Sequence, residues 1–158
     1  MAETFAELEP YFAAYLNRLS LAQRRKIFRK IGMELRKANA KRIAANVEPD
    51  GSPMQRRRKR KRIKGANGRI RRTKKMFPKI RLTKALRVRP GNEGVELSFV
   101  NPIVTKTAAA HQYGLTDFVG KTKAGKVVRT KYPARVLLGF GPEDLDEITD
   151  LALKLLEV

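Results

Sequence analysis

The sequence predicts an α+β fold: N-terminal helices, a small antiparallel sheet and a C-terminal amphipathic helix, with a long basic arm inserted between helix and sheet. Apolar residues recur at spacings of three and four over residues 21–46 and after residue 141, which indicates amphipathic helices. Residues 94–100 instead alternate between apolar and polar side chains, the period of a half-buried strand. With 158 residues, the chain fits a single domain, 1–158, in which residues 52–79 form the basic arm or a long loop.

Two helices are expected before the arm. The first covers residues 4–18, and its apolar face consists of Phe5, Leu8, Phe12, Leu16 and Leu19. Ser20 and Gln23 have the spacing of a capping box, so we expect a longer helix to begin there and to cover residues 21–46. Its apolar stripe consists of Ile27, Ile31, Leu35, Ala38 and, at the edge, Ile43.

The arm follows a turn at Pro49-Asp50-Gly51. Large apolar side chains are sparse in residues 52–79, so we expect this segment to have little core of its own. A loop of this length in a compact domain is usually functional or disordered. The contact residues that we expect in it are Arg56, Arg57, Arg58, Lys59, Arg60, Lys61, Arg62, Lys64, Arg69, Arg71, Arg72, Lys74 and Lys75.

Regular structure resumes near residue 80. Residues 82–89 and 94–100 are expected to form two strands joined by a hairpin loop, and residues 126–132 a third strand. A short helix over residues 105–113 would end at Gly114, which suits the left-handed conformation of a helix C-terminus.

The last helix is expected after a turn at Pro133-Ala134-Arg135 and a start at Gly141-Pro142. Acidic residues in its first turn complement the positive end of the helix dipole. Its apolar face consists of Leu145, Ile148, Leu151, Ala152 and Leu155.

The formal net charge of +21 is local. Residues 55–89 contain 18 basic residues and no acidic residue, whereas residues 143–158 contain six acidic residues and one basic residue. Such a block repels itself and needs a negative counterpart to become ordered. Nucleic acid and an acidic protein surface are both candidates, and a solvated loop is a third interpretation. Phe77 is the one aromatic residue in the block, which disfavours base stacking.

Little in the sequence supports catalysis. The chain has no cysteine and a single histidine, His111, with no carboxylate nearer in sequence than Asp117. We therefore expect a structural histidine, no catalytic residue, no metal site and no cofactor. The acidic N-terminus argues against a signal peptide, and the absence of a long apolar run argues against a membrane contact.

Three groups of residues occur in a characteristic order. They are Arg42-Ile43 with Pro49-Asp50-Gly51-Ser52-Pro53-Met54; His111-Gln112-Tyr113-Gly114; and Tyr132-Pro133-Ala134-Arg135-Val136-Leu137-Leu138-Gly139 with Pro142-Glu143-Asp144. Over residues 8–157 the chain resembles the phage virion morphogenesis family, the tail-completion proteins of Mu-like and P2-like tailed phages. That family has a variable basic insertion at residues 55–79, and Met54 stands where it usually has an aromatic residue.

The resemblance implies a structural virion protein of the neck that is assembled in the host cytoplasm and is not an enzyme. It would complete the tail and join head to tail as a homo-oligomeric ring, expected to be a hexamer. Its partners would be the connector or head-completion protein and the tail terminator or tail tube protein. The positions that would define its fold are Pro49, Asp50, Gly51, His111, Gln112, Tyr113, Gly114, Pro133, Arg135 and Gly139.

The basic arms of such a ring could meet the acidic last helix of a neighbouring subunit, acidic surfaces of the connector or tail terminator, or genomic DNA crossing the neck. A tightly cationic lining would hold DNA that has to slide, so protein partners are preferred. The alternative function is that of an RNA- or DNA-binding basic protein of the ribosomal type. The ordered motifs and the lack of stacking aromatics argue against it. An enzyme that uses His111 is a third, remote hypothesis.

Overall fold

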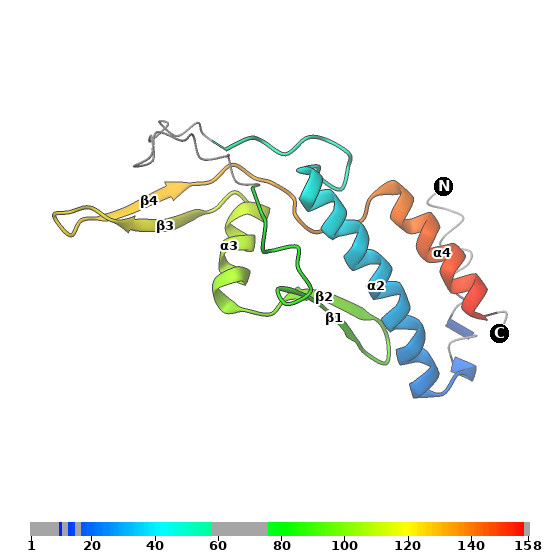
Figure 1. Cartoon of the computed structure of the whole chain (residues 1–158). Coiled ribbons are helices and arrows are strands. Elements are labelled where there is room, and N and C mark those ends of the chain that lie inside the picture. The colour runs from blue at the N-terminus through cyan, green and yellow to red at the C-terminus, as the bar shows by residue number, and fades with distance from the viewer. Residues whose placement is uncertain (1–9, 11–12, 15–16, 58–75, 157–158) are drawn as a thin grey trace, which may run out of the picture.

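The computed structural model describes residues 10, 13–14, 17–57 and 76–156 (Figure 1). These residues form three named helices and four strands, which confirms the α+β class. In chain order the elements are α2 (Leu21–Ala45), β1 (Leu86–Pro90), β2 (Val95–Phe99), α3 (Pro102–Gln112), β3 (Thr116–Lys121), β4 (Val127–Lys131) and α4 (Pro142–Leu156). The helix expected over residues 4–18 lies mostly outside the described residues, as do residues 58–75 of the arm. No helix in the described part of the chain is long and apolar enough to cross a membrane.

Helix α2 begins and ends with capping interactions that its sequence encodes. The Ser20 hydroxyl accepts a hydrogen bond from the Gln23 backbone N–H at 3.3 Å, and the Gln23 side chain accepts one from the Ser20 N–H at 2.9 Å. This is the predicted capping box. At the other end Asn46 adopts a left-handed conformation with φ 58°, which closes the last turn.

The strands form two separate antiparallel hairpins, β1–β2 and β3–β4, where a single small sheet was expected. Strand β3 was not predicted. Its pairing with β4 is shifted between Phe118 and Gly120, and this irregularity interrupts the alternation by which a strand is recognised in a sequence.

Helix α2 lies between the β1–β2 hairpin on one side and α4 on the other (Figure 1). The hairpin comes very close at Gly32. A Cβ atom at this position would lie 2.4 Å from Val88 Cγ1 and 2.5 Å from Val95 Cγ2. The missing side chain of Gly32 therefore allows the hairpin to pack against the helix.

The main core cluster joins residues that are far apart in the sequence. It consists of Ile43, Met54, Met76, Phe77, Ile80, Ala108 and Leu137. Three of these residues, Met54, Met76 and Phe77, come from the two ends of the expected arm. The expectation that residues 52–79 have little core of their own is therefore wrong at both ends.

Helix α3 begins earlier than predicted because Asn101 caps it, accepting a hydrogen bond from the Ile103 N–H at 2.8 Å. It ends as predicted, since Gly114 follows with φ +64° and the Leu115 N–H bonds the Ala110 carbonyl at 2.8 Å. This is a Schellman closure.

Two predictions near the C-terminus need correction. No turn occurs at Pro133-Ala134-Arg135, because residues 132–137 run as irregular extended chain. Leu145 was assigned to the apolar face of the last helix, but it is 43% exposed. Helix α4 begins at Pro142, as expected. The side chain of Leu155 lies outside the described residues.

Candidate functional site

Residues 132–141, which we call the strap, connect β4 to α4 and cross the middle of the molecule (Figure 1). The strap belongs to neither sheet, so its backbone polar groups need other partners. The Gln112 side chain supplies three hydrogen bonds. Its Oε1 accepts from the N–H groups of Leu137 at 2.7 Å and Leu138 at 3.1 Å, and its Nε2 donates to the Leu138 carbonyl at 3.0 Å. The amide therefore acts as a short substitute for a neighbouring strand.

Helix α2 holds the next residue of the strap through Asn39, which is 1% exposed. The Gly139 N–H donates to Asn39 Oδ1 at 3.1 Å, and Asn39 Nδ2 donates to the Leu35 carbonyl at 2.9 Å. Both the oxygen and the nitrogen of this buried amide therefore have a hydrogen-bond partner.

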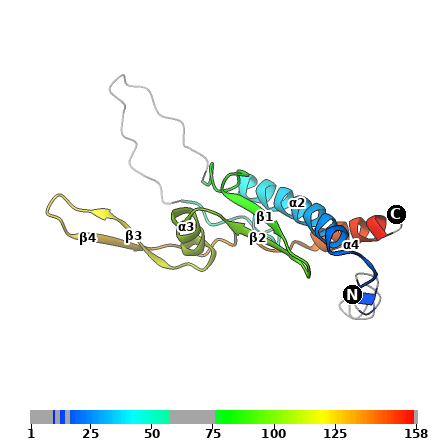
Figure 2. The same ribbon diagram turned by 90° about the horizontal axis from the view of Figure 1, so that it is seen from below.

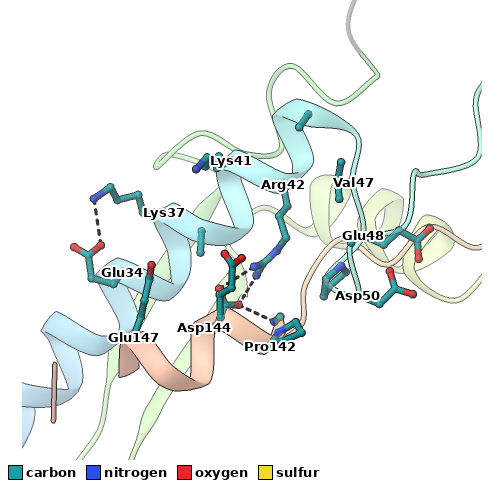
Figure 3. Close-up of a pocket in the computed structure, with 16 residues that line it drawn as sticks. Glu34, Lys37, Lys41, Arg42, Val47, Glu48, Asp50, Pro142, Asp144 and Glu147 are labelled. Atoms are coloured by element: carbon teal, nitrogen blue, oxygen red, sulfur yellow. Dashed lines mark hydrogen bonds and ion pairs between the residues drawn. The ribbon is translucent and has the colours of Figure 1, made fainter. Parts of the chain in front are cut away.

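A buried ion pair between α2 and α4 closes the end of the strap (Figure 3). Arg42 Nη1 donates to Asp144 Oδ1 at 2.8 Å, and Arg42 Nη2 donates to Asp144 Oδ2 at 2.6 Å. Arg42 Nη2 also bonds the Gly139 carbonyl at 3.2 Å, and the Gly141 N–H donates to Asp144 Oδ2 at 2.9 Å. This bidentate geometry is the strongest form of such a pair.

The environment of Asp144 acts on its pKa in two directions. Burial, the largest influence, raises the pKa, but the hydrogen bonds from Arg42 and the Gly141 N–H, together with the charge of Arg42, lower it more. The net result is a pKa below the ordinary value of 3.8. The pair lines a groove of about 660 Å³ between α2, α4 and the turn at residues 47–51.

The strap passes so close to the Pro49 turn that two glycines are required. A Cβ atom on Gly139 would lie 2.8 Å from Pro49 Cγ, and one on Gly141 would lie 3.0 Å from the Pro49 carbonyl. The turn itself is formed as predicted, with Gly51 at φ +86° and Asp50 Oδ1 accepting from the Ser52 N–H at 2.9 Å. The Ser52 hydroxyl and N–H bonds to this carboxylate hold the pKa of Asp50 below its ordinary value.

Arg135 anchors the start of the arm. Its side chain is buried; Nε donates to the Gln55 carbonyl at 2.6 Å and Nη2 to the Arg56 carbonyl at 3.4 Å. Its backbone N–H donates to the His111 carbonyl at 2.7 Å. Across the same site Arg57 Nη2 donates to the Met76 carbonyl. The two described ends of the arm, at residues 57 and 76, are therefore joined directly.

His111 lies at the centre of this anchorage. Its ring contacts Phe77 edge to face at 5.0 Å and Tyr132 at 4.6 Å between ring centroids. Arg135 Nη1 lies 2.9 Å from His111 Nδ1. Because a guanidinium only donates, Nδ1 accepts this bond and the proton of the neutral ring resides on Nε2. Burial, followed by the charges of Arg135 and Arg57, lowers the pKa of His111 from 6.5 to about 4.

The imidazole of His111 is therefore expected to titrate with a midpoint near pH 4 in the folded protein. Since the fold disfavours the charged ring, its contribution to stability is intact above pH 6.5 and declines as the pH falls from 6.5 towards 4. The chain has one histidine, so its ring C–H resonance can be followed by NMR without assignment. In urea the same resonance should titrate near 6.5. A midpoint near 6.5 in the folded protein would contradict the buried hydrogen bond.

The structure brings many of the residues that the resemblance marked as fold-defining to the strap and its anchorage. These are Pro49, His111, Gln112, Gly114, Arg135 and Gly139, with Pro133 lining the groove beside His111, while Asp50 and Gly51 form the turn at Pro49. Tyr113 differs, since its side chain is 71% exposed. Arg56 and Arg57 lie at the arm base. The remaining expected arm contacts, Arg58 to Lys75, lie outside the described residues.

Replacing Gln112 with alanine is expected to lower the free energy of unfolding by about 2–3 kcal/mol, because buried N–H groups of the strap lose their acceptor. Tyr113→Ala is the matched control one residue away. Its exposed ring predicts a change within about 0.5 kcal/mol. Urea titrations followed by circular dichroism measure both. Equal losses in the two variants would rule out the proposed role of the Gln112 amide.

Sequence reasoning missed Asn39, Arg42 and Asp144 as a connected group. Asn39 follows Leu35 and precedes Ile43 by four residues each, so it is a polar residue on a predicted apolar stripe. That position was the available signal for a buried polar contact. Asp144 was explained by the helix dipole, which accounts for an acid at a helix start but not for its partner. Within the described residues, no group of three or more His, Asp or Glu side chains could hold a metal ion.

Comparison with known proteins confirms the resemblance given by the three motifs. The chain is 32% identical over 153 residues to the tail completion protein S of Escherichia phage P2, and the alignment covers 97% of both chains. No solved structure is similar enough to count as a match. A family match extends over residues 5–157, almost the whole chain. The protein therefore belongs to the phage virion morphogenesis family.

Proposed function

We propose that this protein is a structural virion component that completes the tail and joins it to the head. The observation that carries the proposal is the similarity to a tail completion protein along 97% of both chains. It acts in the neck as a ring, a hexamer, between the head connector or head-completion protein and the tail terminator or tail tube. The geometry supports a scaffold: the buried polar side chains Asn39, Arg135 and Asp144 all hold other parts of the chain.

The same geometry supports a role without catalysis. His111 is the one imidazole in the sequence, and its Nδ1 is occupied by Arg135. With its pKa lowered to about 4, the ring stays neutral at neutral pH and is far from the value that suits a general base there.

The basic arm meets acidic protein surfaces in this proposal. A groove of about 750 Å³ at its base is lined by the arginines Arg56, Arg57 and Arg135. Guanidinium groups pair with carboxylates in a bidentate manner, so the groove suits an acidic segment of the connector or tail terminator. DNA in the neck is the competing partner.

Deletion of the gene from the phage or prophage that encodes it tests the proposed function. Electron microscopy of the particles should show heads and tails that remain separate, and a plasmid copy should restore joined virions. Normal virions without the protein would refute the role in the neck. Normal virions combined with altered translation would instead support a ribosomal type of function.

The arm is tested by replacing the arginines and lysines of residues 58–75 with glutamine. Deletion of the whole arm is unsuitable because Met54, Met76 and Phe77 belong to the core. If DNA is the partner, retention on DNA should weaken and its salt dependence should become shallower, since fewer counterions are released. If acidic proteins are the partner, as proposed, the salt dependence is unchanged while the variant fails to restore joined virions.

A further inference from the structure

The β3–β4 hairpin stands apart from the rest of the described protein. In both views it projects from one end of the molecule, while α4 lies at the opposite end (Figures 1 and 2). Among the described elements, β3 contacts α3, and the strand partner of β4 is β3 in a two-stranded sheet. A two-stranded hairpin is marginally stable in water by itself, and both of its outer edges offer unpaired backbone groups. The hairpin is therefore a surface that needs a covering partner.

One face of this hairpin combines apolar and basic side chains. Phe118 lies opposite Arg129, and Lys121 lies opposite Val127. Residues that are directly opposite share a face, so these four side chains gather on one side together with Lys131. All five are exposed, Phe118 and Val127 each by 49%. We call this the hairpin face.

The hairpin's acid forms its salt bridge with α3, and its interaction with Arg129 of that face is the weaker one. Asp117 is opposite Thr130 on the other side of the hairpin. Its carboxylate contacts Lys106 Nζ of α3 at 3.0 Å. The hairpin face therefore carries positive charge around two apolar side chains.

Helix α4 presents a surface of the opposite kind. Glu143, Asp146, Asp150 and Leu153 follow one another at spacings of three and four, so they lie along one side of the helix. All four are exposed, Leu153 by 45%. The other side of α4, which carries Asp144, packs on α2. We call the exposed stripe the helix face.

We propose that the hairpin face of one subunit docks on the helix face of a second copy of this chain. Phe118 and Val127 would cover Leu153, while Lys121, Arg129 and Lys131 would meet Glu143, Asp146 and Asp150. Because the two faces differ and lie at opposite ends of the molecule, the contact is head to tail, and repetition of such a contact closes a ring when the rotation allows it. The inference rests on the ring of the proposed function and identifies the surfaces that form it.

Cross-linking tests the contact, because the chain has no cysteine. The variant Val127→Cys with Leu153→Cys is placed in the phage instead of the natural gene, and purified particles are treated with a short bismaleimide. A ladder of covalent multimers is expected on a denaturing gel, ending at the number of subunits in the ring. Each single-cysteine variant should give at most dimers. Particles that contain the double variant but yield no multimers would overturn the proposed contact while leaving the neck function intact.

Charge reversal supplies the matched test in solution. Arg129→Glu with Lys131→Glu makes the hairpin face negative, and Asp146→Lys with Asp150→Lys makes the helix face positive. In each variant alone, the hairpin face and the helix face then carry charges of the same sign. Their repulsion should weaken self-association roughly a hundredfold, as measured by sedimentation. An equimolar mixture places opposite charges at every contact and should restore the association. The chain with all four changes should also associate.

These outcomes separate the contact from the function. If deletion of the gene leaves virions normal, the neck function fails, and cross-linking of the purified protein still decides whether the two faces meet. If both reversed variants associate as the natural protein does, the contact is wrong. Circular dichroism shows that each variant is folded. If the chain with all four changes associates, the loss of association in the two separate variants is due to their charges and not to misfolding.

Discussion

Replacing Asp144 with alanine is expected to lower the free energy of unfolding by about 3–5 kcal/mol, the usual cost of removing one partner from a buried ion pair. Arg42 would keep its charge in a site with 17% of its side chain exposed, and the Gly141 N–H would lose its acceptor. The strap would also lose a connection to α2, because Arg42 of α2 is held against the Gly139 carbonyl by the same pair. Urea denaturation gives the difference.

Glu143→Ala is the control for this prediction. Glu143 lies next to Asp144 in the same first turn of α4 but is exposed. Its contribution through the helix dipole is about 0.3–1 kcal/mol. If both variants lost the same stability, the dipole would explain both acids and the ion pair would contribute nothing beyond it.

The pH dependence of the Asp144 effect has a defined sign. Since the folded-state pKa of Asp144 lies below its ordinary value of 3.8, the stabilisation is complete above that value and disappears as the pH falls through the folded-state pKa. The natural protein and Asp144→Ala should therefore converge in stability in strong acid. A constant difference down to pH 2 would contradict the linkage to this carboxylate.

Gly32→Ala is expected to destabilise the protein although it removes a glycine from the middle of a helix. Alanine favours a helix over glycine by about 1 kcal/mol. At this position, however, the new Cβ atom would lie 2.4 Å from Val88 and 2.5 Å from Val95, and overpacking of this kind costs about 1–3 kcal/mol. The clash should therefore outweigh the helix propensity, and thermal denaturation should show a lower midpoint.

The sign should reverse when the two valines are shortened. In a protein that carries Val88→Ala and Val95→Ala, the nearest remaining Val88 atom to the new Cβ is the Cβ at 3.6 Å, an ordinary contact. Adding Gly32→Ala to that protein should raise stability by up to about 1 kcal/mol. A destabilising effect of equal size in both proteins would show that the contact with the β1–β2 hairpin is not its cause.

Local signals predicted much of the fold. The capping box at Ser20, the alternation over β2 and the glycine after α3 each depend on a few adjacent residues, so they can be read without knowledge of tertiary contacts. Strand β3 was missed because its bulge disturbs the alternation. The start of α3 was placed too late because the capping role of Asn101 was not considered.

The candidate site could be predicted only in part, because its contacts join distant segments. The motifs that contain Gln112 and Arg135 could be recognised from the order of their residues in the sequence. That Gln112 replaces a strand partner is visible only in three dimensions. Arg42 and Asp144 are 102 residues apart, and nothing in the sequence near either residue specifies the other. The base of the arm was similarly hidden, because Phe77 reaches His111 from a segment that looked purely basic.

The strap has a consequence for how the length of the chain can change among related phages. It is fastened residue by residue, with Arg135 held at the arm base, Leu137 and Leu138 at Gln112, and Gly139 at Asn39. Inserting or removing a single residue would shift every later contact by one position. The β3–β4 loop at residues 122–126 lies at the projecting end of the hairpin (Figure 1), and its backbone hydrogen bonds, Thr122 N–H to the Lys126 carbonyl and Gly125 N–H to the Thr122 carbonyl, stay within the loop. Related proteins should therefore vary in length at the hairpin tip and keep a constant number of residues in the strap.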